Sequence, residues 1–442
     1  MKRKRPMKEE NRPNEDQTSG SPEVKFNFDS EGFQKALMAE VKKAGGTENF
    51  YKQAGGAASL AQSIMKPFYQ ALLDAEMAEH LGYEKDEPEG KGSGNSRNGR
   101  GSKKIRGDFG EVEISTPRDR NSTFDPKIIK KREAAVGNFT EKIISLYSRG
   151  MTTREVEEHL QEIYGIDVSP QFISRATQTV EQEITQWQNR ELDSVYPVVY
   201  VDGLRVSIRD PSKGVMSKCV YIVLGISVSG RQEVLGLWIE DTEGARFWLK
   251  VFNDLKARKV EDIIILCGDG LKGLPEAVQA VYPKTDVQLC VVHQIRTATK
   301  FVAFKDRRKF CNDMRPIYTA PTVEAAELAL DNFAATWEST YPMSVASWRK
   351  NWMLLTAFLK YPVELRKTIY TTNAIESLNA QLRKNTANRK VFPTEDSVIK
   401  ILYLNLRNFT NKWNKRHGWD IVMNQLSLLF PDRLNIRKEF EF

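Results

Sequence analysis

The chain has 442 residues, of which 40% are hydrophobic and 28% are charged, and its formal net charge is +8. This length and composition predict two or three ordered domains and exclude a largely disordered protein. No stretch approaches the roughly 18 apolar residues of a membrane span, so we expect no membrane partner. The N-terminal stretch 1–30 is basic and lacks the apolar core of a secretory signal. It is expected to be a disordered tail of a cytoplasmic protein.

The four cysteines are Cys219, Cys267, Cys290 and Cys311, and none belongs to a C-x-x-C pair. In a long chain without a signal peptide, cysteines are expected to be reduced. Cys290 and His293 have the spacing of a metal-binding pair. A zinc site usually needs four ligands, however, and no second pair is apparent. The sequence therefore argues against zinc at this position.

Basic side chains are concentrated in two segments. Residues 91–106 hold six basic residues and no acidic one, and residues 296–309 hold six against Asp306 alone. Such clusters suit a polyanion, of which nucleic acid is the commonest. The glycines and serines of the first segment predict a flexible linker or a loop that follows DNA.

The region before residue 193 is expected to be mostly helical, apart from one short strand in GEVEISTPRDR. Thr152 and Glu155 form a predicted capping box, and Ser169 before a proline predicts another helix start. The two helices resemble a helix-turn-helix, whose second helix would present Gln171 and Arg175 to a major groove. A plain helical bundle or dimerisation unit is the alternative.

Apolar runs after residue 193 predict a mixed sheet. Strands are expected at YPVVYVDG, KCVYIVLGISV, EVLGLWIE, 263–266 and 287–292, with helices on either side of the fourth. Three strands before the first crossover exclude a dinucleotide-binding half, which alternates from its first strand. The order β-β-β-α-β-α-β matches the ribonuclease H-like order, which has an antiparallel hairpin leading into a mixed five-stranded sheet.

The loop 268–273 fits G-x-G-x-x-G between a strand and a helix, as a dinucleotide-binding fingerprint requires. Asp269 stands in the middle of the loop, where its carboxylate would repel a pyrophosphate. The next acid, Asp286, precedes its strand instead of following it. We therefore expect no nicotinamide cofactor, and we interpret the glycines as clearing space around Asp269.

Asp202 and Asp269 each follow an apolar run, and they meet at one edge of the sheet if the two strands are parallel. Two carboxylates there can share divalent cations, and phosphoryl transfer on DNA commonly uses two ions about 3.5–4 Å apart. A turn or cap role is the alternative for each Asp-Gly pair.

Glu376 is the third candidate acid. It shares one helical stripe with Asn379 and Arg383, next to an apolar stripe that would pack. The alternative is that Glu376 closes a capping box with Asn373 and only fixes the start of its own helix.

Several of these segments resemble the Mutator-type transposases of bacterial insertion sequences. They are YVDGLRV, CGDGLKGL, QLCVVHQIR and the long block YPVELRKTIYTTNAIESLNAQLRKNT…VFPTEDSVIKILYL, in the family's order. The resemblance implies a DDE recombinase on a ribonuclease H-like core, with an all-helical insertion and a mostly helical DNA-binding N-terminal region.

The expected domain bounds follow the same order. Before the core we expect a basic tail at 1–30, a helical segment and linker at 31–110, and a strand and helix-turn-helix-like region at 111–192. The first part of the core is expected at 193–300, the insertion at 301–365, and the catalytic Glu helix with C-terminal helices at 366–442.

The resemblance also implies the chemistry. The family's three acids map onto Asp202, Asp269 and Glu376, which would hold two Mg²⁺ ions, with Mn²⁺ as a substitute. Cys290 and His293 match the family's C-x-x-H signature, for which a structural or DNA-positioning role is expected. The implied partner of this bacterial cytoplasmic protein is double-stranded DNA, both terminal inverted repeats and target, bound by a homodimer or higher oligomer. The expected DNA-contacting residues are Arg97, Arg100, Lys103, Lys104, Gln171, Arg175, Arg296, Asn379, Arg383, Lys384, Arg389 and Lys390.

Two other functions remain open from the sequence. One is a catalytically inactive DNA-binding relative that acts as a regulator, against which the presence of all three acids argues. The other is a structure-specific nuclease on the same core, which would release DNA ends without joining them.

Overall fold

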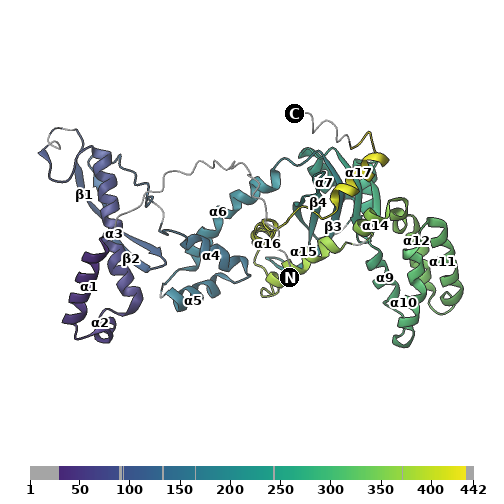
Figure 1. Ribbon diagram of the computed structural model, residues 1–442, viewed down its shortest axis with the longest axis horizontal. Helices are drawn as coiled ribbons and strands as arrows, with labels where there is room; N and C mark the ends of the chain where they lie inside the picture. The colour runs from purple at the N-terminus through teal and green to yellow at the C-terminus, as the bar shows by residue number, and fades with distance from the viewer. Residues whose placement is uncertain are drawn as a thin grey trace, which may run out of the picture. The chain divides into compact units, whose positions relative to one another are not determined.

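The computed structural model describes residues 29–88, 92, 94–131, 134–164, 166–241, 244–370 and 372–434. The chain divides into two compact units, and Figure 1 labels most of their helices and several of their strands. The first unit comprises Met1–Ser102 and Val112–Ile128, and the second comprises Lys103–Glu111 and Ile129–Phe442. No helix in the described ranges is long and apolar enough to cross a membrane. The predicted tail at 1–30 lies almost wholly outside the described residues.

The first unit is built from helices and most of a β-hairpin. Its elements are α1 (Ser30–Lys43), α2 (Thr47–Gln53), α3 (Gly56–Leu81), β1 (Arg97–Gly107) and β2 (Gly110–Asp119). β1 pairs with β2, so residues 97–107 form a strand where the sequence predicted a linker or loop. Alternate side chains of β2, including Val112 and Ile114, are buried and give the hairpin an apolar face. Backbone pairing with the edge of β2 orders β1 despite its glycines and serines.

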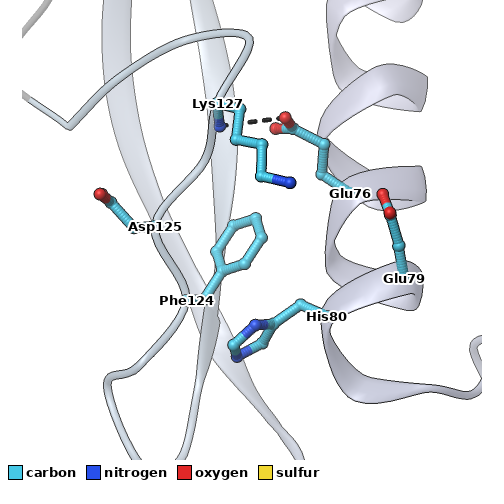
Figure 2. A pocket seen from close by; sticks show the side chains of 6 residues that line it. All are labelled: Glu76, Glu79, His80, Phe124, Asp125 and Lys127. Atoms are coloured by element: carbon cyan, nitrogen blue, oxygen red, sulfur yellow. Dashed lines mark hydrogen bonds between the residues drawn. The ribbon is translucent and has the colours of Figure 1, made fainter.

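Helix α3 fixes the segment that follows β2. The Glu76 carboxylate accepts hydrogen bonds from the backbone N–H groups of Lys127 and Ile128, both at 3.0 Å. Figure 2 shows Glu76 and His80 on α3 facing Phe124 and Lys127 across a cleft of about 240 Å³. A carboxylate that accepts two backbone N–H groups satisfies donors that the irregular segment would otherwise leave unpaired.

The second unit begins with three helices, α4 (Phe139–Ser148), α5 (Thr153–Tyr164) and α6 (Pro170–Asn189). The predicted capping box is confirmed, because Thr152 Oγ1 accepts from Glu155 N at 3.2 Å and Glu155 Oε2 accepts from Thr152 N at 2.6 Å. The predicted cap of the next helix is also confirmed, since Ser169 Oγ accepts from Phe172 N at 3.3 Å. The three helices share an apolar core.

A mixed five-stranded sheet follows, as predicted. Its strands are β3 (Val195–Asp210), β4 (Gly214–Ile226), β5 (Gln232–Glu240), β6 (Asp262–Gly268) and β7 (Asp286–Leu289). Helices α7 (Ala245–Ala257) and α8 (Leu274–Val281) flank β6, which confirms the β-β-β-α-β-α-β order. The spatial order is β5-β4-β3-β6-β7, in which β3, β4 and β5 are antiparallel and β3, β6 and β7 are parallel. The last strand ends three residues before its predicted end, because a helix begins at Val291.

Side chains alternate between the two faces of β3. Val199 and Val201 belong to the cluster that packs against α7 and α8. Val198, Tyr200 and Leu204 belong to the larger cluster on the opposite face, which includes side chains of the C-terminal helices. Asp202 has the same parity as this second set, so its side chain is directed toward the C-terminal helices.

Between β7 and the Glu376 helix, the described residues form only helices and turns, in agreement with the predicted all-helical insertion. These helices are α9 (Val291–Thr299), α10 (Phe304–Thr319), α11 (Val323–Trp337), α12 (Pro342–Lys350), α13 (Trp352–Leu355), a 3-10 turn (Ala357–Lys360) and α14 (Val363–Ile369). In Figure 1, α10, α11 and α12 lie side by side, and Phe310, Phe333 and Trp337 form the aromatic centre of this group. The chain continues with α15 (Asn373–Thr386), α16 (Glu395–Thr410) and α17 (Trp419–Leu429).

Two glycines of the loop after β6 have different roles. Gly273 has a φ of 78°, and a Cβ there would lie 2.2 Å from the backbone nitrogen of Ala245 at the start of α7. Gly270 has no atom within 4 Å of a Cβ placed on it. Gly273 is therefore required for the close approach of α7, whereas the sequence interpretation had both glycines clearing space around Asp269.

Gly273→Ala is expected to lower the free energy of unfolding by at least about 1–2 kcal/mol, the cost of left-handed backbone in a residue with a Cβ. The contact with Ala245 adds to this cost. Gly270→Ala, the matched control, should stay within about 0.5 kcal/mol of wild type. Urea unfolding followed by tryptophan fluorescence gives both values. Equal midpoints for the two variants would contradict the role assigned to Gly273.

Candidate active site

The register of the parallel strands brings three reactive side chains to one edge of the sheet. The last paired positions across β3, β6 and β7 are Val201, Gly268 and Leu289. The residues that follow them are Asp202, Asp269 and Cys290, which therefore occupy neighbouring positions at this edge. The parallel pairing that the sequence argument required is present. Asp202 does not end its strand, however, because β3 continues to Asp210 while paired with β4.

Helix α15 brings the third acid to the same edge. Its apolar stripe, including Ile375, Leu378 and Leu382, is buried against the core, and α15 packs on β3. The neighbouring stripe of Glu376, Asn379 and Arg383 lies beside the acids: Asn379 Nδ2 donates to Asp202 Oδ2 at 2.5 Å. The predicted two-stripe helix thus places its polar stripe at the edge that carries Asp202.

The capping-box alternative for Glu376 is not formed. The N-cap of α15 is Thr372, and no side chain caps the helix. The Glu376 carboxylate instead contacts α9, where Oε1 lies 3.3 Å from Arg296 Nη1 and 3.5 Å from His293 Nδ1. Glu376 is therefore available as a functional group at the start of α15.

The Asp202 carboxyl is only 8% exposed. Burial, and then the nearby charge of Asp269, raise its pKa. Hydrogen bonds from Gly203 N, at 2.7 Å, and from Asn379 act in the opposite direction, as does the charge of Arg383, but they do not outweigh burial. Asp202 and Asp269 are thus close enough to repel each other when both are ionised.

His293 lies between the two other acids. Its Nδ1 is 2.5 Å from Asp269 Oδ1, although neither atom has a hydrogen-bond partner of good geometry among the described residues. The contact with Asp269, and then that with Cys290, raise the pKa of His293. Arg296 Nη1 lies 3.1 Å from Nε2 on the other side of the ring. With the pKa raised, the ring carries a proton on Nδ1 that faces Asp269, and Nε2 can accept from Arg296 only when the ring is neutral.

Cys290 is buried beside this histidine. It is the N-cap residue of α9, and its backbone N–H donates to Gly268 O at 2.8 Å. Thr372 Oγ1 donates to its Sγ at 3.2 Å. Burial alone would raise the pKa of the thiol, but hydrogen bonds with His293 and Thr372 together lower it. One ligand atom each from Asp269, Cys290 and His293 lie within 4.8 Å of one another.

The residues expected to contact DNA near the acids divide into an exposed group and a buried group. Arg296, Arg383, Lys384 and Lys390 are exposed. Arg389 is only 8% exposed, its guanidinium donates to Gly150 O and Met151 O, and it stacks on Tyr147. Asn379, with no exposed surface, bonds Asp202. The structure thus gives Arg389 and Asn379 partners inside the protein.

The remaining predicted DNA contacts lie elsewhere in the chain. Gln171 and Arg175 are exposed on α6. In the hairpin, Arg97 lies over the Tyr83 ring and Arg100 contacts Asp74 at 2.7 Å. Lys103 Nζ donates to Lys130 O at 2.5 Å, and Lys104 contacts Glu111 at 2.7 Å. These four hairpin cations therefore already have partners within the protein.

Thr372 was not identified from the sequence. Its hydroxyl contacts Cys290, and it lies 3.5 Å from Glu376 Oε1. The available signal was its position four residues before Glu376, on the same side of the helix start. The contact of His293 with two acids was also missed, because it depends on the register of β6 and β7.

Carboxylates gathered at the edge of a mixed sheet, with exposed arginines and lysines around them, are typical of enzymes that act on nucleic acids. A family model described as "Transposase, Mutator family" matches residues 38–416. The chain belongs to the Mutator family of transposases.

Curated relatives agree with this assignment. The chain is 44% identical over 380 residues to the transposase for insertion sequence element ISRM3 of Rhizobium meliloti, covering 86% of this chain and 94% of the relative. It is 43% identical over 338 residues to a probable insertion-sequence transposase of Corynebacterium diphtheriae, covering 72% and 98%. It is 31% identical over 385 residues to the transposase for IS905 of Lactococcus lactis, covering 86% and 97%.

The raised pKa of Asp202 predicts a pH dependence of the metal-free protein. In the unfolded chain the Asp202 carboxyl titrates at about pH 3.9. The stability that the protonated carboxyl gives the folded protein is therefore fully present below about pH 4. That contribution is lost as pH rises through the higher pKa of the folded state. The unfolding free energy of wild type minus that of Asp202→Asn should therefore fall with rising pH, by about 1.4 kcal/mol per unit of pKa shift. Urea midpoints of both proteins in EDTA test this, and a flat or rising difference would contradict it.

Proposed function

We propose that this chain is the transposase of a bacterial insertion sequence and that it cuts and joins DNA at the ends of its element. The observation that carries the proposal is the convergence of Asp202, Asp269 and Glu376 at one edge of the sheet. Membership of the Mutator family supports it, as does the similarity to proteins named as transposases for insertion sequence elements. We assign the sheet and its helical insertion to the ribonuclease H-like fold on the strand order and directions.

The three acids fit divalent metal ions. Asp269 Oδ1 is a buried oxygen without a hydrogen-bond partner among the described residues, and the pKa of Asp202 is raised by a second carboxyl beside it. Clustered carboxylate oxygens are the ligands that Mg²⁺ and Mn²⁺ prefer. Asp202, Asp269 and Glu376 would hold two such ions. When bound, the ions supply Lewis-acid stabilisation of the attacking and leaving oxygens of a phosphodiester.

The protein's own side chains position these acids. Asn379 and Gly203 N hold the two oxygens of Asp202, which leaves the carboxyl little freedom to rotate. Arg296 and His293 hold Glu376 near Asp269. Positioning of this kind lowers the cost of bringing reacting groups together, which is a main contribution to phosphoryl transfer.

Exposed cations extend from the acids along two helices, and we propose that they bind the DNA backbone. Arg383 and Lys384 lie in the last turn of α15. Arg296 lies in the last turn of α9, which leads to the basic start of α10. There, Phe301 is 73% exposed and Phe304 is 89% exposed among lysines and arginines. Exposed aromatic rings among cations are suited to stacking on unpaired bases while phosphates are held.

The helix-turn-helix-like pair α5 and α6 is the proposed reader of the terminal inverted repeats. Gln171 and Arg175 are exposed in the first two turns of α6, where a recognition helix contacts base edges. A homodimer or higher oligomer on DNA is part of the proposal, because an element has two ends to be brought together. The proposed location is the bacterial cytoplasm, where the element's DNA lies.

Asp202→Asn, Asp269→Asn and Glu376→Gln are each expected to reduce cleavage and joining to the level of a control without protein. Neutral amides are poor ligands for hard cations, whereas the acids contribute little to attraction for a polyanion, so affinity for element ends should change little. Labelled element ends, target plasmid and Mg²⁺ with each purified variant provide the measurement.

Glu276→Gln is the matched control for these variants, because Glu276 is an exposed acid on α8. It should cleave and join like wild type. Wild-type strand transfer by Glu376→Gln would remove Glu376 from the active site. Cleavage without joining by wild type would favour a nuclease, and end binding without either would favour a regulator.

The proposed backbone contacts predict a salt dependence. Each phosphate contact contributes about 0.9 to the slope of log K against log salt, so neutralising Arg383 and Lys384 together should reduce the slope by about 1.8. Lys250 and Lys256, exposed on α7 on the opposite face of the sheet, are the matched control pair and should leave it unchanged. Neutralising Arg100, Lys103 and Lys104 tests the hairpin separately. Identical slopes for the α15 and α7 variants would exclude Arg383 and Lys384 from the DNA interface.

A further inference from the structure

A second set of metal-binding side chains lies beside the three acids and consists of Asp269, Cys290 and His293. Neither the proposed two-ion chemistry nor the proposed DNA surface requires this combination. Cys290 follows the last paired residue of β7, as Asp269 follows that of β6, so the pairing of these strands places them side by side. His293 lies three residues after Cys290, one turn into α9. A carboxylate, a thiol and an imidazole from three chain positions therefore converge, with ligand atoms within 4.8 Å of one another.

Two buried polar atoms of this set face each other as an ion pair without good hydrogen-bond geometry. Asp269 Oδ1 and His293 Nδ1 are buried and have no hydrogen-bond partner of good geometry in the described part of the chain, although they lie 2.5 Å apart. Buried polar atoms are paired in the great majority of cases, so each exception calls for an explanation such as a missing ion. A cation between Oδ1 and Nδ1 would satisfy both atoms in place of the proton that faces Asp269.

The chemistry of the set selects the ion. Thiolate and imidazole are softer ligands than those that Mg²⁺ takes, and mixed sulfur, nitrogen and oxygen sites favour Zn²⁺. Zn²⁺ binds such ligands at about 2.0–2.3 Å, and three ligand atoms within 4.8 Å of one another are near enough to share one ion. The sequence argued against zinc because only two ligands were apparent, and Asp269 is the third. A site with three protein ligands keeps an open position, which Glu376, 3.5 Å from His293 Nδ1, is placed to approach.

We infer that Asp269, Cys290 and His293 form a binding site for Zn²⁺ or a similar soft divalent ion, and that its occupation blocks the use of Asp269 by the catalytic ions. The inhibitory part rests on the proposed function, since it assumes that Asp269 serves Mg²⁺. The binding part does not. Zn²⁺ bound here is therefore an inhibitor of the Mg²⁺-dependent reaction, relieved by chelation.

Co²⁺ is the probe for binding, because Co²⁺ bound to a thiolate has a charge-transfer absorption that carboxylate and imidazole ligands do not produce. Titration of the reduced, full-length protein should give this band at one equivalent, and Zn²⁺ should remove it. Cys290→Ser should lack the band, while Cys311→Ser, which alters a half-buried cysteine on α10, should keep it. Absence of the band in wild type, or its persistence in Cys290→Ser, would overturn the site.

His293→Gln provides a second variant that keeps the thiol. Loss of a residue that only supports a metal ligand costs about 10–100-fold in affinity, so loss of a ligand should weaken Zn²⁺ binding at least as much. Circular dichroism of both variants separates this effect from misfolding. Unchanged Zn²⁺ affinity in a folded His293→Gln would exclude the histidine and contradict the proposed ligand set.

Inhibition is measured separately, on cleavage of labelled element ends by wild type in Mg²⁺. Added Zn²⁺ should abolish cleavage, and a chelator selective for Zn²⁺ should restore it. Co²⁺ binding without any Mg²⁺-dependent cleavage would support the metal site but contradict the proposed function. Cleavage that is unaffected by saturating Zn²⁺ would show that the site, though real, does not control Asp269.

Discussion

The constraint on which the second unit depends is the gathering of like charges at one edge of its sheet. Parallel pairing of β3 with β6 places Asp202 and Asp269 at adjacent positions, and the packing of α15 on β3 adds Glu376. The charge of Asp269 adds to burial in raising the pKa of Asp202, and repulsion between ionised carboxylates opposes folding. Side chains on α9 and α15 that contact these acids act against this repulsion.

The metal-free protein offsets the repulsion with its own side chains. His293 and Arg296, one turn apart on α9, place positive or proton-donating groups against Asp269 and Glu376. The Asn379 amide donates to Asp202 from a position with no exposed surface. Burial and the charge of Asp269 outweigh these groups, so the pKa of Asp202 stays raised. This remaining repulsion is what the proposed cations would relieve.

Much of the site followed from local patterns in the sequence. The apolar run before Asp269 indicated a strand end, which is confirmed, and the helical period put Glu376 and Asn379 on one stripe. The strand end predicted at Asp202 is wrong, because β3 continues to Asp210. What could not be predicted depended on register and packing. The adjacency of Asp269 and Cys290 requires the pairing of Gly268 with Leu289. The strand β1 depends on its pairing with β2, which the glycine- and serine-rich composition of residues 97–107 did not indicate.

The two aspartates differ in how firmly the fold holds them, and this difference suggests different roles for them in the proposed metal site. Asp202 lies within β3, which continues eight residues beyond it, and both its carboxyl oxygens accept hydrogen bonds. Asp269 lies in the loop between β6 and α8, and the protein group closest to its carboxyl is a histidine that lacks good hydrogen-bond geometry. In the proposed metal site, Asp202 would therefore serve as a fixed ligand. Asp269, held by the fold less firmly, would be the acid that responds when a cation takes the place of His293 as its partner.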